Sequence, residues 1–85
     1  MPIISRFFGI VIYMYWKDHS PPHFHAKYQD QEIIMDIKSG KIEGIISNKA
    51  LQLINEWRKK HITELLEDWQ FASDRRALNN IEPLE

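Results

Sequence analysis

The sequence of 85 residues contains no cysteine, which excludes disulfide scaffolds, thiol catalysis and cysteine-based zinc sites. Its eleven basic and twelve acidic residues give a net charge of −1, without the basic excess typical of a dedicated nucleic-acid binder. No apolar run approaches the ~20 residues that span a bilayer, and the first residues lack the features of a signal peptide. We therefore expect a single domain over residues 1–85, located in the cytoplasm and not in a membrane.

The segment from Phe7 to Trp16 is β-branched and aromatic almost throughout, which predicts the first strand of a sheet. Apolar residues occupy both of its faces, as in a central strand that is covered on two sides. The following Pro21-Pro22 pair cannot continue a regular strand, so it predicts an extended turn.

Three more strands follow in the predicted sheet. The segment His23 to Tyr28 alternates, with Phe24, Ala26 and Tyr28 on one face and His23, His25 and Lys27 on the other. The next strands are expected at about Glu32 to Lys38 and Lys41 to Ile46. Turns at Gln29-Asp30 and Ser39-Gly40 connect these strands.

The second half of the sequence predicts one long helix from Asn48 to about Ala72, with Ser47 as its N-cap. Its apolar residues recur at spacings of three and four, as on one face of an amphipathic helix. This apolar stripe rotates along the helix, which places a bend near His61, although no proline or glycine forces one. The stripe consists of Ala50, Leu53, Ile54, Trp57, His61, Leu65, Trp69 and Ala72.

Together these elements predict an α+β fold: a four-stranded antiparallel meander with one long C-terminal amphipathic helix packed on one face. A single helix covers only one face of the sheet. The apolar residues on the other side of the first strand therefore need a cover, which a homodimer or a protein partner would supply.

The segment from Asp18 to His25 holds the only concentrated polar chemistry, with three of the four histidines and one carboxylate in eight residues. Imidazole and carboxylate groups are ligands for zinc and other transition metals. His23 and His25 are two residues apart on a predicted strand, so they point the same way. One interpretation is therefore a metal site of His19, His23 and His25, with Asp18 beside them, if the proline pair folds His19 back.

A second interpretation is acid–base catalysis without a metal. A histidine that titrates near neutral pH, an orienting aspartate and a nearby lysine are suited to cleaving RNA by activating its 2′-hydroxyl. The candidate catalytic residues are Asp18, His19, His23 and His25, with Lys27 as the nearby cation. Against this ribonuclease interpretation stand the balanced charge and the lack of a clear phosphate clamp.

A third interpretation is structural. Aspartate and proline build tight turns, and aspartate and histidine side chains satisfy backbone groups in them. Phe24 then inserts into the core while the flanking histidines are simply exposed on the strand. His61 lies on the apolar stripe of the helix, where a core histidine bonded to a backbone carbonyl is the simpler interpretation and a ligand facing the loop is the alternative.

The string Asp18-His19-x-Pro21-Pro22-His23-Phe24-His25-x-x-Tyr28 resembles a prokaryotic family known as domain of unknown function 4160. Members are often encoded beside domain of unknown function 2442, in an arrangement similar to toxin–antitoxin pairs. The resemblance implies no catalytic residues, because none are settled for the family. It covers nearly the whole chain and also includes Phe8-Gly9-Ile10, Asp36-Ile37, Gly40, Ala50-Leu51, Glu56-Trp57, Leu65-Leu66, Trp69 and Ile81-x-Pro83-Leu84.

The resemblance therefore implies a component of a two-protein, toxin–antitoxin-like complex that acts through protein–protein binding. Its partner would be a small protein encoded by a neighbouring gene. Lys27 and Tyr28 are the candidate binding residues beside the loop. The metal-independent ribonuclease and the transition-metal site remain the two alternatives.

Overall fold

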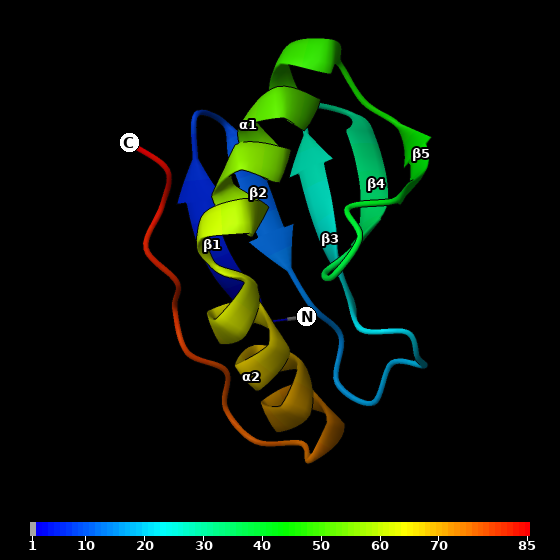
Figure 1. The fold of residues 1–85 in the computed structure, drawn as a ribbon, viewed down its shortest axis with the longest axis vertical. Coiled ribbons are helices and arrows are strands. Elements are labelled where there is room, and N and C mark those ends of the chain that lie inside the picture. Colours follow the sequence, from blue (N-terminus) through cyan, green and yellow to red (C-terminus); the bar gives the residue numbers. More distant parts are fainter. Residues whose placement is uncertain (1) are drawn as a thin grey trace.

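The computed structural model describes residues 2–85 and contains a five-stranded antiparallel sheet, with one helix across a face and a second helix beside the ends of the strands (Figure 1). The strands follow one another in chain order as a meander, and each pairs with the next. The elements are β1 (Ile3–Phe7), β2 (Ile10–Tyr13), β3 (His23–Tyr28), β4 (Gln31–Asp36), β5 (Ile42–Ile45), α1 (Asn48–Lys60) and α2 (Ile62–Ser73).

The predicted first strand was wrong, because the chain reverses within it and forms two strands. Phe8 and Gly9 make the turn between β1 and β2, with φ angles of 50° and 80°. Two consecutive residues at positive φ are what a type I′ hairpin turn requires, and glycine adopts this conformation readily. A bulky aromatic residue rarely adopts a positive φ. From the sequence alone, Phe8 therefore favours a continuous strand and not a turn. The sheet consequently has five strands, not four.

The strand from His23 to Tyr28 was predicted correctly, including its two faces. Phe24 and Ala26 are fully buried in the core, where Phe24 meets Trp57 of α1, whereas His23 and His25 lie on the opposite face of the sheet. Strands β4 and β5 begin and end within two residues of their predicted bounds. The hydrophobic alternation is thus sufficient to set the register of these strands.

The prediction of one long helix was also wrong, because the helix breaks at His61. This residue has φ −130° and ψ 26°, which is not helical, and its N–H donates to the carbonyl of Arg58 at 3.0 Å. The change of direction allows Trp57 in α1 and Leu65 in α2 both to be fully buried against the core. At the other end, Ser47 caps α1 as predicted, since its Oγ accepts from the N–H of Ala50 at 3.2 Å.

The C-terminal segment, residues 74–85, runs back along β1 beside the helices (Figure 1). The N–H of Ile81 donates to the carbonyl of Ile4 at 2.8 Å, and Ser5 Oγ donates to the carbonyl of Ile81 at 3.0 Å. The indole of Trp57 donates to the carbonyl of Glu82 at 2.8 Å. This segment therefore covers part of the β1 edge and closes the core from that side.

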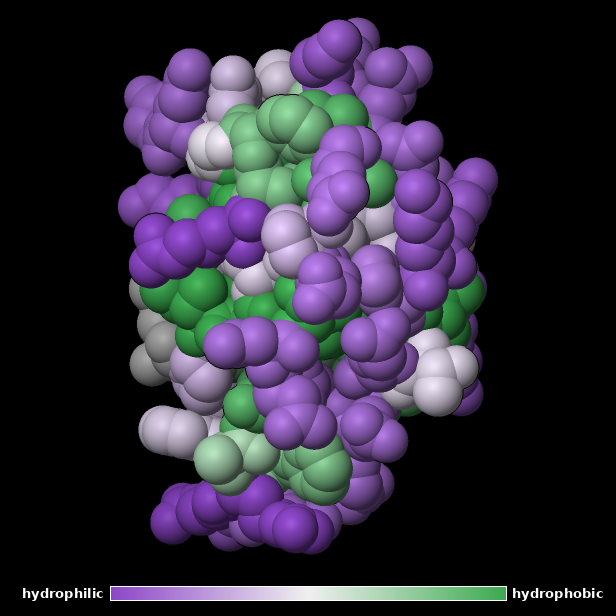
Figure 2. Space-filling view, turned by 90° about the vertical axis from the view of Figure 1, so that its left-hand side faces the viewer, coloured by the Kyte–Doolittle hydropathy of each residue, from purple (hydrophilic) through white to green (hydrophobic). Residues whose placement is uncertain are grey.

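The outer face of the sheet, opposite the helices, is partly covered by the chain itself. Tyr13 is only 1% exposed there, because His25 stacks on its ring and Tyr15 packs against it edge-on. On the side of the molecule at the left of Figure 1, apolar side chains reach the surface in separate small areas among hydrophilic ones (Figure 2). Among residues 2–85, the large apolar side chains that remain exposed are Phe8, Tyr15, Trp16 and Ile45.

Within residues 2–85, neither α1 nor α2 is long and apolar enough to cross a membrane.

Candidate metal centre

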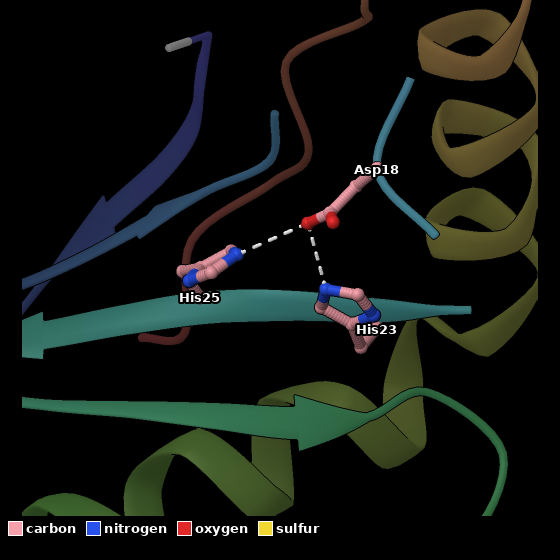
Figure 3. A group of neighbouring side chains, drawn as sticks. All are labelled: Asp18, His23 and His25. Atoms are coloured by element: carbon pink, nitrogen blue, oxygen red, sulfur yellow. Dashed lines mark hydrogen bonds and ion pairs between the residues drawn. The ribbon is translucent and has the colours of Figure 1, made fainter. Parts of the chain in front are cut away.

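Three of the predicted site residues meet on the outer face of the sheet (Figure 3). Oδ2 of Asp18 lies 2.8 Å from Nε2 of His23 and 3.4 Å from Nε2 of His25. One potential ligand atom from each residue lies within 4.8 Å of the other two. Residues separated by up to seven positions in the chain thus form one cluster of two imidazoles and one carboxylate.

The cluster is built from a strand and a loop. His23 and His25 come from the outer face of β3, where their spacing of two residues makes them parallel neighbours. Asp18 comes from the loop between β2 and β3, which Pro21 and Pro22 turn back toward the strand. The preceding residue is anchored to the helical layer, because the N–H of Lys17 donates to the carbonyl of Ala72 at 3.1 Å.

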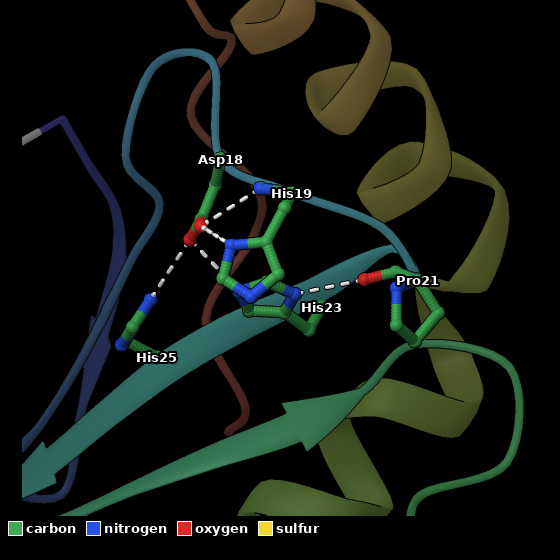
Figure 4. Close-up of polar contacts among 5 residues, drawn as sticks. All are labelled: Asp18, His19, Pro21, His23 and His25. Atoms are coloured by element: carbon green, nitrogen blue, oxygen red, sulfur yellow. Dashed lines mark hydrogen bonds and ion pairs between the residues drawn. The ribbon is translucent and has the colours of Figure 1, made fainter.

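The hydrogen bond made by Nδ1 of His23 determines whether Nε2, the other ring nitrogen, carries a proton or a lone pair. Nδ1 lies 2.8 Å from the carbonyl oxygen of Pro21, which only accepts hydrogen bonds, so Nδ1 carries a proton (Figure 4). In a neutral ring Nε2 then points its lone pair at Oδ2 of Asp18, 2.8 Å away. Two lone pairs at that distance repel each other, so the arrangement is stabilised by a cation between them, either a second proton or a metal ion.

His25 is held between aromatic rings. Its imidazole stacks on Tyr13 with 5.1 Å between ring centroids and meets Tyr15 edge-on at 4.7 Å. Burial lowers the pKa of His25 below its ordinary value, and the hydrogen bond to Asp18 only partly opposes this effect. The neutral imidazole, which is the form that binds metals, is therefore favoured at this position.

Asp18 is the shared partner of both rings, and its side chain is 16% exposed. Burial raises the pKa of Asp18, but hydrogen bonds from the N–H of His19 and from the rings of His23 and His25 outweigh this effect. The pKa of Asp18 consequently lies below its ordinary value, and the carboxylate is ionised at neutral pH. An ionised carboxylate between two imidazoles attracts a cation strongly.

His19 is placed differently from the other two loop histidines. Its side chain is 91% exposed, and its Nδ1 lies 3.1 Å from the other carboxylate oxygen of Asp18, Oδ1. The predicted set of four is thus brought together as three converging residues, with His19 at the rim (Figure 4). His61 lies outside this cluster and bonds through Nδ1 to Glu64 at 2.6 Å.

The cluster opens into a pocket of about 430 Å³. Its far wall is formed by Ile34 and Asp36 of β4, Glu43 of β5 and Lys41 just before β5. These residues were not predicted from the sequence, although residues two apart on a strand share a face. Neither candidate binding residue lines this pocket: Lys27 is exposed further along β3, and Tyr28 lines a separate hollow beside Phe8. The pocket residues are Tyr15, Asp18, His19, Ser20, Pro21, His23, His25, Ile34, Asp36, Lys41 and Glu43.

The spacing of Asp18 Oδ2 from each histidine nitrogen suits a transition metal. Zinc lies about 2.0–2.2 Å from nitrogen and oxygen ligands, which places neighbouring ligand atoms roughly 3 Å apart. The distances of 2.8 and 3.4 Å from Asp18 Oδ2 to the two histidines are of this size. Two histidines and one carboxylate, with positions left open toward a pocket, also match the ligand set of non-haem iron sites.

The chain belongs to a family described as domain of unknown function (DUF4160), whose model matches residues 9–70. The matched region contains the loop, β3 and all three residues of the cluster. Searches of curated proteins and of solved structures found no significant match.

Proposed function

We propose that this domain binds one divalent transition-metal ion through Asp18, His23 and His25 and presents it to a ligand in the adjoining pocket. The observation that carries the proposal is the convergence of two Nε2 atoms on Oδ2 of Asp18, at 2.8 and 3.4 Å. Zinc and ferrous iron are the ions that this ligand set suits best.

The surroundings of His23 also fit a metal ion at this point. Metal-binding histidines usually donate their second ring N–H to a carboxylate or backbone carbonyl, which fixes the tautomer and orients the ring. The bond from Nδ1 of His23 to the carbonyl of Pro21 is of this kind. Because Pro21 lies in the same loop as Asp18, one turn orients two of the three ligands.

A metal ion bound here would act as a Lewis acid toward whatever enters the pocket. An ion with three protein ligands keeps a position for water or substrate, and it lowers the pKa of that water toward neutrality. Asp18, His23 and His25 would hold the ion, and the wall opposite them would contact the ligand. Hydrolysis is the reaction class that this arrangement favours.

The proposal is tested by metal titration of protein prepared without a histidine tag and stripped with a chelator. We expect one Zn²⁺ or Co²⁺ ion per chain by calorimetry. Ion at 100 times its Kd adds about 2.7 kcal/mol to the free energy of unfolding, which raises the Tm by about 10–20 °C in a domain of this size. His23→Ala and His25→Ala should each weaken binding at least 100-fold, whereas Lys27→Ala, an exposed change on the same strand, should not.

A wild-type protein that binds no ion and whose Tm does not respond to Zn²⁺, Co²⁺ or Fe²⁺ would refute the proposal. The same stripped protein also tests the ribonuclease alternative, in which Asp18, His19, His23 and His25 act as acids and bases without a metal. Cleavage of RNA by the chelator-treated protein, lost in His23→Ala, would support that alternative. Cleavage that appears only after metal is added would support the metal centre.

A second proposal concerns partners: the domain acts in the cytoplasm within a two-protein, toxin–antitoxin-like complex formed with a small protein from a neighbouring gene. It is supported by large apolar side chains left at the surface, of which Ile45 on the edge strand β5 is 81% exposed. Coexpression and copurification with the neighbouring gene product would test it. Ile45→Thr should weaken the complex, and failure of the wild-type proteins to copurify would contradict it.

A further inference from the structure

We infer that His19 is a displaceable fourth ligand, which closes the metal centre at rest and leaves it when a ligand enters the pocket. This inference rests on the metal centre proposed above and adds its mode of regulation. It begins from a contrast between the three loop histidines: two are buried and fixed by neighbours, whereas the side chain of His19 is 91% exposed.

The position of His19 brings its ring close to Asp18, at the rim of the three-residue cluster. Its Nδ1 lies 3.1 Å from Oδ1 of Asp18, the carboxylate whose other oxygen faces His23 and His25. An ion bound at Oδ2 would therefore lie within one side-chain rotation of an imidazole nitrogen of His19. Exposed side chains change rotamer within picoseconds to nanoseconds, so this rotation is fast.

Two other carboxylates of the pocket, Asp36 and Glu43, are less suited to this position. Oδ1 of Asp36 already accepts from the N–H groups of Lys38 and Ser39, at 2.9 and 2.8 Å. Glu43 pairs with Ile34, which in turn pairs with His25, so it lies two strands away, or about 10 Å.

A fourth protein ligand changes what the centre does. Zinc sites with four protein ligands are closed and structural, whereas those with three keep an open position for chemistry. With His19 bound, the ion is protected from solvent. A small ligand with an oxygen or nitrogen donor atom would replace the imidazole, which then moves back to the rim, where its Nδ1 lies 3.1 Å from Oδ1 of Asp18.

Cobalt substitution tests this inference, because the spectrum of Co²⁺ reports its ligands. In His19→Ala we expect Co²⁺ affinity to fall by about tenfold or more and the visible absorption to change, with added imidazole restoring both. In His19→Cys we expect a thiolate-to-cobalt charge-transfer band in the near ultraviolet. Since the natural sequence has no cysteine, such a band can arise only from position 19. Lys27→Ala serves as the control and should behave like the wild type.

The outcomes distinguish this inference from the proposed metal centre on which it rests. If wild-type protein binds Co²⁺ but His19→Ala has the same affinity and spectrum, and His19→Cys shows no charge-transfer band, His19 is not a ligand and the three-residue centre still stands. If wild-type protein binds none of Zn²⁺, Co²⁺ and Fe²⁺, both ideas fail together.

Discussion

His23 and Asp18 are joined through Nε2 and Oδ2 at 2.8 Å, although one lies on a strand and the other in a loop. The opposite nitrogen of the same ring is tied to the carbonyl of Pro21, also at 2.8 Å. The imidazole is thus held at both ends, which leaves it little freedom to turn. A ring fixed in this way keeps its Nε2 directed at the carboxylate whether or not a ligand occupies the pocket.

The tautomer of His23 in the metal-loaded protein is the first prediction. If a metal takes Nε2, the remaining proton must reside on Nδ1, where it is hydrogen-bonded to Pro21. Nitrogen-15 NMR of zinc-loaded protein should therefore show a slowly exchanging Nδ1–H for one histidine, and this signal should disappear in His23→Ala. A zinc-loaded protein in which His23 carries its proton on Nε2 would contradict the geometry.

The second prediction concerns Arg58, a charged residue that is buried in α1. Its Nη1 donates to the carbonyls of Ile37 and Lys38, at 2.9 and 3.3 Å, and so clamps the β4–β5 turn to the helix. Arg58→Met would keep the aliphatic volume but leave these carbonyls without a donor. We expect a loss of about 2–4 kcal/mol in the free energy of unfolding, measured by urea denaturation.

Lys59→Met is the matched control for Arg58→Met, because Lys59 is the next residue in the helix and is exposed. It should change the free energy of unfolding by less than about 0.5 kcal/mol. Amide hydrogen exchange in the β4–β5 turn should also accelerate in Arg58→Met alone. Equal stability of the two variants would show that the clamp contributes nothing.

The third prediction is a pH dependence of stability that arises from Asp68, which is 1% exposed. Its Oδ1 accepts from the N–H of Asn79 at 2.9 Å, whereas Oδ2 has no hydrogen-bond partner within residues 2–85. Burial raises the pKa of Asp68 from 3.8 to about 6, and the nearby carboxylates of Glu67 and Glu64 add to this effect. Asp68 binds its proton more tightly in the folded state than in the unfolded state, so protonation of Asp68 stabilises the fold. This stabilisation is complete below pH 3.8 and is lost as the pH rises through 6.

Over that interval, the expected loss of stability from Asp68 is about 3 kcal/mol. Asp68→Asn removes the charge and keeps an acceptor for Asn79, so its stability should fall less between pH 4 and 7 than that of the wild type. Urea denaturation across this range, with chelator present, measures the difference. Asp30→Asn, an exposed change in the β3–β4 turn, should reproduce the wild-type profile. Parallel profiles for wild type and Asp68→Asn would contradict the assignment.

The fourth prediction tests the C-terminal segment through Ile81, which is buried against the core. Ile81→Ala should cost about 2–5 kcal/mol of the free energy of unfolding, as expected for removing a large buried aliphatic side chain. Asn80→Ala, at the exposed neighbouring position, should be nearly neutral. If Ile81→Ala were equally neutral, the segment would be only loosely attached to β1.

Much of the sheet could be predicted because its apolar residues alternate. Strand β3 was predicted with its bounds and faces, since only one register buries Phe24 and Ala26 together. The turn at Phe8-Gly9 could not be predicted from apolar patterning, because Phe8 looks like a strand residue and its positive φ is imposed by the fold.

The break of the helix at His61 could not be predicted from apolar patterning either. A rotating apolar stripe indicates that a straight helix cannot bury all of its apolar residues, but it does not say whether the helix bends or breaks. The packing of Trp57 and Leu65 on the same core decides this, and those contacts are tertiary.

The candidate site was predictable in composition but not in arrangement. The loop residues could be named from the sequence, whereas the separation of His19 from His23 and His25 depends on how the loop turns. Lys41 and Glu43 reach the pocket only because β5 lies two strands from β3 in the sheet. The sequence of the loop does not indicate that Lys41 and Glu43 lie beside it.

The bond from Lys17 to Ala72 has a consequence for how the two layers of the molecule depend on each other. The residue next to Asp18 is attached to the end of α2, while His23 and His25 belong to the sheet. Separating α2 from the sheet would pull the carboxylate away from both imidazoles. The three groups therefore converge only when the layers are docked, so an ion bound among them would act as a cross-link between helix and sheet.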